Sequence, residues 1–180
     1  LMNGDGSVIR RLEEGASSNL AITFSPDERE VIGIGADGAP WRWDASTGAS
    51  LGATEISRGA RTIESYTGYV LLSFEAGYAE LWTWPEQQLV HQFRGHGAAL
   101  RGAAFLPDMS RVVTIGRDQT VRLWDPKTGD ETAMLRTERP TPEQLAVDPS
   151  GDAILVKFED RDAQILRISP LRERIRSLDK

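Results

Sequence analysis

The chain of 180 residues contains no cysteine, which excludes a disulfide framework and a thiolate metal site. Its 27 acidic residues outnumber its 21 Lys and Arg, and the resulting net charge of −6 argues against nucleic-acid binding driven by general attraction to phosphate. No apolar run approaches the roughly 20 residues that span a bilayer, and no signal-peptide pattern opens the chain. We therefore expect a cytoplasmic protein that binds neither nucleic acid nor membrane.

Groups suited to catalysis are also scarce. The chain has only two histidines, His91 and His96, and it lacks both a Gly-Lys-Ser/Thr phosphate loop and a two-histidine metal motif. Carboxylates are numerous, but their spacing selects no pair. We expect no enzyme activity, no metal and no cofactor.

Two patterns resemble ligand-binding motifs without meeting their requirements. The glycines of 33–38 match the dinucleotide-binding pattern, but strand-forming residues 39–43 follow where that motif needs a helix. The acidic residues of 148–159 match part of a calcium loop, but Ala153 stands where the loop needs glycine. Both segments are interpreted as turns between strands.

What the chain does contain is a series of short apolar runs with 17 glycines and 9 prolines mostly at their borders, a pattern typical of all-β proteins. Runs such as Val70–Phe74 are apolar on both faces, which indicates strands enclosed between neighbouring sheets. No convincing amphipathic helix is present, and 171–178 is interpreted as a strand.

Three tryptophans reveal a repeat. Trp43, Trp84 and Trp124 end similar phrases at spacings of 41 and 40 residues, and extending the step reaches Met2 in one direction and Ile168 in the other. A period near 40 indicates one supersecondary unit used several times. The clearest copy contains Gly95-His96 and ends in Leu123-Trp124-Asp125.

These motifs resemble the WD40 family, whose repeats open near Gly-His and close near Trp-Asp. The resemblance covers essentially the whole chain, is most specific at 95–129, and implies a β-propeller of four-stranded antiparallel blades. We place the four blades at about 15–56, 57–94, 95–136 and 137–180. Residues 1–14 supply an orphan outer strand, so we expect an excerpt of a larger ring, or alternatively self-association of two copies into eight blades.

The resemblance also implies a buried hydrogen-bonded chain of His96, Thr114, Asp118 and Trp124 that supports the third blade. The alternative is a His–Asp base beside a hydroxyl nucleophile. We favour the structural role because the spacing is that of the repeat itself. In the second repeat Tyr78 falls where the aspartate belongs; in the fourth, Asp162 remains and Ile168 replaces the tryptophan. We expect these incomplete blades to rely more on apolar packing.

Three arginines are the candidate partner-binding residues. By alignment with the family, Arg101, Arg117 and Arg161 lie on one narrow face, where guanidinium groups would bind carboxylates or phosphates. The alternative is that they are ordinary surface residues paired with local acids such as Asp108 or Asp160. Trp41 and Trp82 are expected to pack between blades.

Together these features favour a noncatalytic scaffold or sensor module that binds proteins, including acidic ones, through loops on the blade faces. The alternative is an accessory or gating propeller of a multidomain enzyme whose catalytic domain lies outside this chain.

Overall fold

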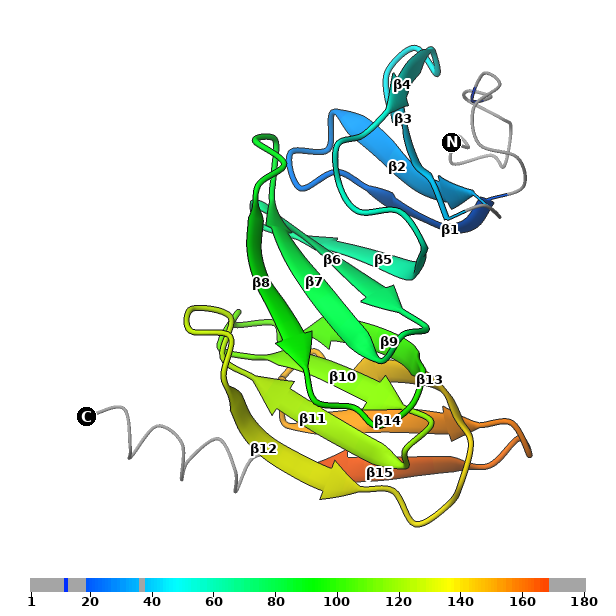
Figure 1. The fold of residues 1–180 in the computed structure, drawn as a ribbon, viewed down its shortest axis with the longest axis vertical. Coiled ribbons are helices and arrows are strands. Elements are labelled where there is room, and N and C mark those ends of the chain that lie inside the picture. Colours follow the sequence, from blue (N-terminus) through cyan, green and yellow to red (C-terminus); the bar gives the residue numbers. More distant parts are fainter. Residues whose placement is uncertain (1–11, 13–18, 36–37, 169–180) are drawn as a thin grey trace.

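The computed structural model describes residue 12, residues 19–35 and residues 38–168 of the chain. Within them the regular structure consists of fifteen β-strands in four antiparallel sheets. The sheets stand side by side in an arc (Figure 1). The fold is all-β, a set of β-propeller blades, as the sequence predicted.

Each sheet, or blade, is a simple meander whose strands pair in chain order. Blade 1 contains β1 (Asn19–Phe24), β2 (Glu30–Gly35), β3 (Pro40–Asp44) and β4 (Ser50–Ala53). Blade 2 contains β5 (Ala60–Tyr66), β6 (Tyr69–Phe74), β7 (Tyr78–Thr83) and β8 (Leu89–Arg94). Blade 3 contains β9 (Leu100–Phe105), β10 (Val112–Gly116), β11 (Thr120–Trp124) and β12 (Glu131–Arg136). Blade 4 contains β13 (Pro142–Val147), β14 (Ala153–Phe158) and β15 (Ala163–Arg167).

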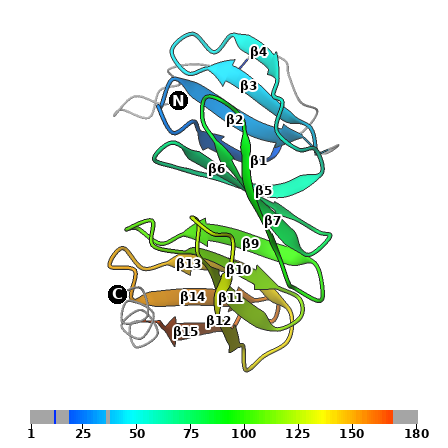
Figure 2. The same ribbon diagram turned by 60° about the vertical axis from the view of Figure 1, so that its left-hand side comes forward.

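The first strands of successive blades are neighbours in space: β1 contacts β5, β5 contacts β9, and β9 contacts β13. They form the inner side of the arc, and the remaining strands of each blade follow outward (Figure 2). The predicted orphan strand at 1–14 and the predicted outer strand of blade 4 at 171–178 lie outside the described residues, apart from residue 12.

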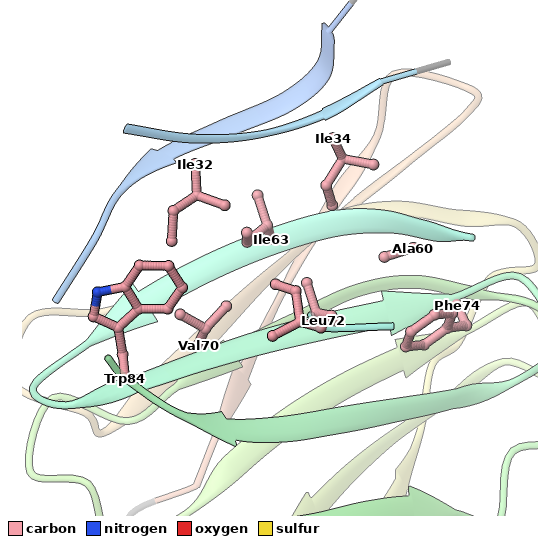
Figure 3. Packing of buried hydrophobic residues seen from close by; sticks show 9 residues of the cluster. Ile32, Ile34, Ala60, Ile63, Val70, Leu72, Phe74 and Trp84 are labelled. Atoms are coloured by element: carbon pink, nitrogen blue, oxygen red, sulfur yellow. The ribbon is translucent and has the colours of Figure 1, made fainter. Parts of the chain in front are cut away.

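The core lies between the blades because each central strand is apolar on both faces. Ile32 and Ile34 of β2 are fully buried against Ile63 of β5 and against Val70 and Leu72 of β6 (Figure 3). Burying each such side chain contributes about 1.5–3 kcal/mol. The opposite face of β6 contributes to a further cluster between blades 2 and 3, and one face of β10 contributes to a cluster between blades 3 and 4.

The strand register corrects the alignment of the second repeat. In blade 3 Val112 pairs with Trp124, and in blade 2 Val70 pairs at the same position with Trp82. Trp82, rather than Trp84, is therefore the closing tryptophan, and the repeat spacings are 39 and 42 residues. Trp84 lies two residues beyond Trp82 and packs into the apolar cluster between blades 1 and 2. It is therefore a core residue, not the residue that closes the repeat.

The hairpin of blade 2 shows the same offset. Gly77 donates its N–H to the Phe74 carbonyl, and the equivalent turn bond in blade 3 lies one residue after Asp118. Ala76, not Tyr78, therefore occupies the aspartate position. Tyr78 instead begins β7 and stacks on Phe74, with the ring centroids 4.5 Å apart.

Blade 4 requires a similar correction. Arg161 donates its backbone N–H to the Phe158 carbonyl in the β14–β15 hairpin. This turn is equivalent to the turn of blade 3 that contains Asp118. Asp160, not Asp162, consequently occupies the position of Asp118. The register of β15 likewise places Leu166, not Ile168, where blade 3 has its tryptophan.

Candidate functional site

The structure brings His96, Thr114, Asp118 and Trp124 together in blade 3. His96 precedes β9, Thr114 lies in β10, Asp118 lies in the following turn and Trp124 ends β11. Asp118 Oδ1 lies 2.9 Å from His96 Nδ1, and Thr114 Oγ1 lies 2.7 Å from His96 Nε2. Trp124 Nε1 donates to the same Thr114 oxygen at 2.8 Å.

One set of proton positions satisfies every member of this chain. Trp124 donates to Thr114, the Thr114 hydroxyl donates to His96 Nε2, and His96 Nδ1–H donates to Asp118. This assignment requires a neutral imidazole. Burial lowers the pKa of His96 below its ordinary value of 6.5, although the Asp118 carboxylate acts in the opposite direction.

Asp118 is held as a carboxylate by several donors at once. Burial acts to raise its pKa, but the hydrogen bonds from His96, the Gly97 N–H and the Thr120 hydroxyl outweigh burial and lower it. The Gly97 N–H lies 2.9 Å from Oδ2 and the Thr120 hydroxyl 2.8 Å from Oδ1. Asp118 thereby connects the loop before β9 to β11.

The chain leaves no reacting group free. The Thr114 side chain is completely buried, and its hydroxyl is already engaged by both His96 and Trp124. A nucleophile needs room for substrate as well as a base, so the arrangement supports structure rather than the hydrolytic alternative.

Gly116 belongs to this arrangement, although the sequence patterns did not indicate it. A Cβ at this position would lie 2.4 Å from His96 Nδ1 and 2.8 Å from Asp118 Oδ1. Only glycine lets the imidazole lie against the end of β10. A glycine two residues before the turn aspartate of the hairpin would have been the signal.

Blade 2 contains a different polar chain, although its incomplete motif predicted mainly apolar packing. Trp82 Nε1 donates to Glu80 Oε2 at 3.0 Å, and Gln92 Nε2 donates to Glu80 Oε1 at 2.7 Å. The Arg94 guanidinium in turn donates to the side-chain oxygen Oε1 of Gln92 and lies over the Tyr78 ring. The polar chain of blade 2 connects β7 to β8. That of blade 3 connects the loop before β9 to β10 and β11.

The three predicted arginines lie in different environments. Arg101, in β9, lines a pocket of about 240 Å³, and its buried Nε lacks a hydrogen-bond partner. Arg117 forms an ion pair with Glu159 at 2.9 Å. Arg161 occupies a left-handed turn position, with φ of 70°, and does not line the pocket.

The alignment that selected Arg161 is wrong by two residues. Glu159 immediately precedes Asp160 and so occupies in blade 4 the position that Arg117 occupies in blade 3. The carboxylate of Asp160, which was expected to pair with one of the three arginines, instead forms an ion pair with Arg139 at 2.6 Å. Asp108 accepts hydrogen bonds from Ser110.

The pocket is built from one repeated backbone feature. The first strand of each of blades 2, 3 and 4 has a register shift just after its first residue, a β-bulge at Arg61, Arg101 and Glu143. A bulge re-aims the side chain of the extra residue. As a result, three residues at the same repeat position line one pocket, which the remaining members complete: Thr62, Leu100 and Glu159.

Metal and cofactor motifs find no support in the described ranges. Among those residues, no group of three or more His, Asp or Glu side chains could hold a metal ion. Asp148 accepts a hydrogen bond from the Ser150 backbone in a turn, while Glu159 follows the far end of β14. The glycines of β2 lead into strand β3, not a helix. In the same part of the chain, no helix is long and apolar enough to cross a membrane.

A family model described as "WD domain, G-beta repeat" matches residues 87–125, the segment that contains the complete polar chain of blade 3. This match supports the resemblance to the WD40-repeat family that the sequence motifs carry. Two Arabidopsis thaliana relatives, cell division cycle 20.6 and 20.5, each described as a cofactor of the APC complex, are 27% identical over 144 residues. These alignments cover 73% of this chain and 34% and 32% of the two relatives.

Human apoptotic protease-activating factor 1 is 26% identical over 158 residues, covering 83% of this chain and 11% of that protein. The chain thus spans about a third or less of the length of these curated relatives. Two computationally designed proteins share its fold at 22% identity. Ika4 has a TM-score of 0.73 and is matched over 94% of its chain, whereas Ika8 has a TM-score of 0.74 and is matched over 50%.

Proposed function

We propose that this chain is a noncatalytic module that binds other proteins. The observation that carries the proposal is the pocket on the first strands of blades 2, 3 and 4, whose charged lining is supported by a rigid frame. The relatives named as a cofactor of the APC complex and as a protease-activating factor act together with other proteins, which supports the same role here.

An acidic partner fits this surface. Arg61 and Arg101 stand at equivalent bulge positions of adjacent strands and line the same pocket. Guanidinium groups bind carboxylates through paired N–H donors, and such contacts steer association as well as strengthen it. Such a binding module fits both functions expected from the sequence, a sensor module and the accessory propeller of a multidomain enzyme. The sequence flanking this chain would distinguish them.

The two ends of the arc expose apolar positions that are buried elsewhere in the fold. Leu155 and Ile165 of blade 4 are 43% and 67% exposed, although they occupy the positions of the fully buried Val113 and Leu123 in blade 3. At the other end, Ile22 and Phe24 of β1 are likewise exposed. We propose that further blades cover both faces, either from a longer chain that completes the ring or from a second copy.

Site-specific cross-linking tests the binding role. A photoreactive residue at Glu143, in the pocket, is expected to capture a partner protein that the same probe at Arg136, on outer strand β12, does not. The captured protein is then purified and its affinity measured directly. Equal capture at both positions, or no measurable affinity of the purified partner, would contradict the proposal.

A further inference from the structure

The charged side chains that line the pocket on the first strands of blades 2, 3 and 4 differ in whether they form ion pairs. Blades 2 and 3 contribute Arg61 and Arg101, and blade 4 contributes Glu143 and Glu159. The volume of about 240 Å³ is below the roughly 300–1,000 Å³ of typical small-molecule pockets. It is suited to one inserted side chain or chain end rather than to a cofactor.

Arg101 is the member that lacks a partner. Its Nε is buried without a hydrogen bond, and its guanidinium forms no ion pair with any described residue. A buried donor that has lost water and gained nothing in return is an unfavourable arrangement in the free protein. A ligand that supplies an acceptor at this point would remove that deficit.

Arg61 is available to join it. Its only ion pair among the described residues is with Glu75 at 3.3 Å, and both side chains are about half exposed. Surface pairs of this kind contribute little, so a ligand can replace Glu75 at low cost. Two guanidinium groups would then face the same acceptor from neighbouring strands.

The opposite wall has its charges already paired. Glu143 is bound by Lys157, and Glu159 by Arg117 at 2.9 Å. Lys157 and Arg117 partly neutralise these two carboxylates, which still face the arginines across the pocket. Both kinds of anion are repelled by Glu143 and Glu159, but a phosphate brings nearly two negative charges and is repelled more strongly than a carboxylate.

We propose that this pocket binds one carboxylate of a partner polypeptide, held by Arg101 and Arg61, and that Glu143 and Glu159 select against phosphate. The proposal rests on the protein-binding function above and identifies the chemistry of the bound group. The carboxylate can belong to an Asp or Glu side chain or to a chain terminus, since both present the same two oxygens to the guanidinium groups.

The Arg101 Nε–H resonance in a nitrogen–proton NMR spectrum reports directly on occupancy. The protein is titrated with N-acetyl-glutamate amide, N-acetyl-alanine with a free carboxylate, N-acetyl-phosphoserine amide and neutral N-acetyl-glutamine amide. We expect a saturable shift with the first two and none with the glutamine probe. The tighter of the two carboxylates identifies its source, and phosphoserine binds more weakly than glutamate.

Variants test the assignment. R101Q and R61Q are each expected to weaken glutamate binding about tenfold, the effect of one charge-assisted hydrogen bond. R136Q, which removes an exposed arginine from outer strand β12, leaves it unchanged. The double variant E143Q/E159Q is expected to bind phosphoserine more tightly than the unaltered protein does.

Failure of this proposal is distinguishable from failure of the binding function. No saturable shift with either carboxylate, or tighter binding of phosphoserine than of glutamate, overturns the carboxylate assignment. If a partner captured at Glu143 still binds R101Q with full affinity, the protein-binding function stands and the carboxylate pocket does not.

Discussion

The indole Nε1 of Trp124 donates a 2.8 Å hydrogen bond to Oγ1 of Thr114, and both side chains are almost completely excluded from solvent. The Thr114 hydroxyl is also hydrogen-bonded to His96, and His96 is hydrogen-bonded to Asp118. The tryptophan that marks the repeat in the sequence is thus the inner end of a polar chain that reaches the surface turn.

Removing the imidazole should destabilise blade 3. H96A leaves the Thr114 hydroxyl and the Asp118 carboxylate without their shared partner, at an expected cost of about 1–3 kcal/mol in the free energy of unfolding. Denaturant unfolding measures the change. H91A, at a half-buried histidine bonded to the Lys127 carbonyl, is the matched control and should cost less. Partner binding should persist in H96A, and an unchanged unfolding curve would contradict the assignment.

Adding a methyl group at Gly116 should disturb the same chain from the backbone side. In G116A the new Cβ would lie 2.4 Å from His96 Nδ1, so the ring must move, at an expected cost of about 1–3 kcal/mol. G97A is the control, because its Cβ would approach nothing closer than 4.0 Å. In the double variant G116A/H96A the two losses should add only in part, since the clash with the ring disappears while the 2.8 Å approach to Asp118 Oδ1 remains. Strict additivity would show that Gly116 serves another purpose.

The polar chain of blade 2 predicts a penalty for a nearly isosteric change. E80Q replaces one carboxylate oxygen with a donor, although both oxygens now accept hydrogen bonds, from Trp82 and Gln92. The unmatched donor should cost about 1–3 kcal/mol in the free energy of unfolding. E86Q, at an exposed position after β7, should change little. Equal stabilities for the two variants would exclude a role for Glu80 in supporting the blade.

Glu64 should make stability depend on pH. Its side chain keeps access to solvent, but desolvation of the carboxyl raises its pKa from 4.5 to about 7, which the Phe105 N–H only partly offsets. Because the folded state favours the protonated form, this contribution to stability is complete below pH 4.5 and is lost as the pH rises towards 7. The stability of E64Q relative to the unaltered protein should therefore increase across that interval.

Unfolding by urea at several pH values between 4 and 8 measures this difference. The comparison between variant and parent cancels the contribution of His96, whose lowered pKa acts in the opposite direction by reducing stability as the pH falls. A constant difference between E64Q and the parent across the interval would show that Glu64 does not titrate as described.

The exposed faces at the ends of the arc should make the isolated chain self-associate. Light scattering is expected to give a mass above the 19.9 kDa of one chain. I165K places a charge on the apolar face of blade 4 and should shift the distribution towards monomer. M134K alters another exposed apolar position, on outer strand β12, and should not. A compact monomer of the unaltered chain would contradict both proposed ways of completing the ring.

The sequence predicted the architecture and the polar chain of blade 3 because both follow from local repeats. A spacing near 40 indicated the blade unit, and strands that are apolar on both faces indicated enclosure between sheets. The same spacing misled the alignment of blade 2, since Trp84 lies at a more even interval than Trp82. Only the register of β6 and β7 distinguishes the two tryptophans.

The pocket and the second polar chain were not predictable from spacing because they depend on contacts between strands. Glu80 meets Gln92 only because β7 and β8 pair side by side. Arg61 was overlooked because its position beside Arg101 depends on a bulge, which leaves no clear trace in composition. The offset in blade 4 had the same origin: nothing in the spacing of Asp160 and Asp162 shows which one occupies the hairpin turn.

The bulge near the start of each inner strand has a consequence for how this surface can diversify. Arg61, Arg101 and Glu143 contribute their side chains to the pocket from one position per blade, apart from the buried clusters between blades and the polar chains within them. A substitution there changes what one blade contributes to the pocket without repacking the buried clusters. The lining of the pocket can therefore diverge one blade at a time, by a single residue in each.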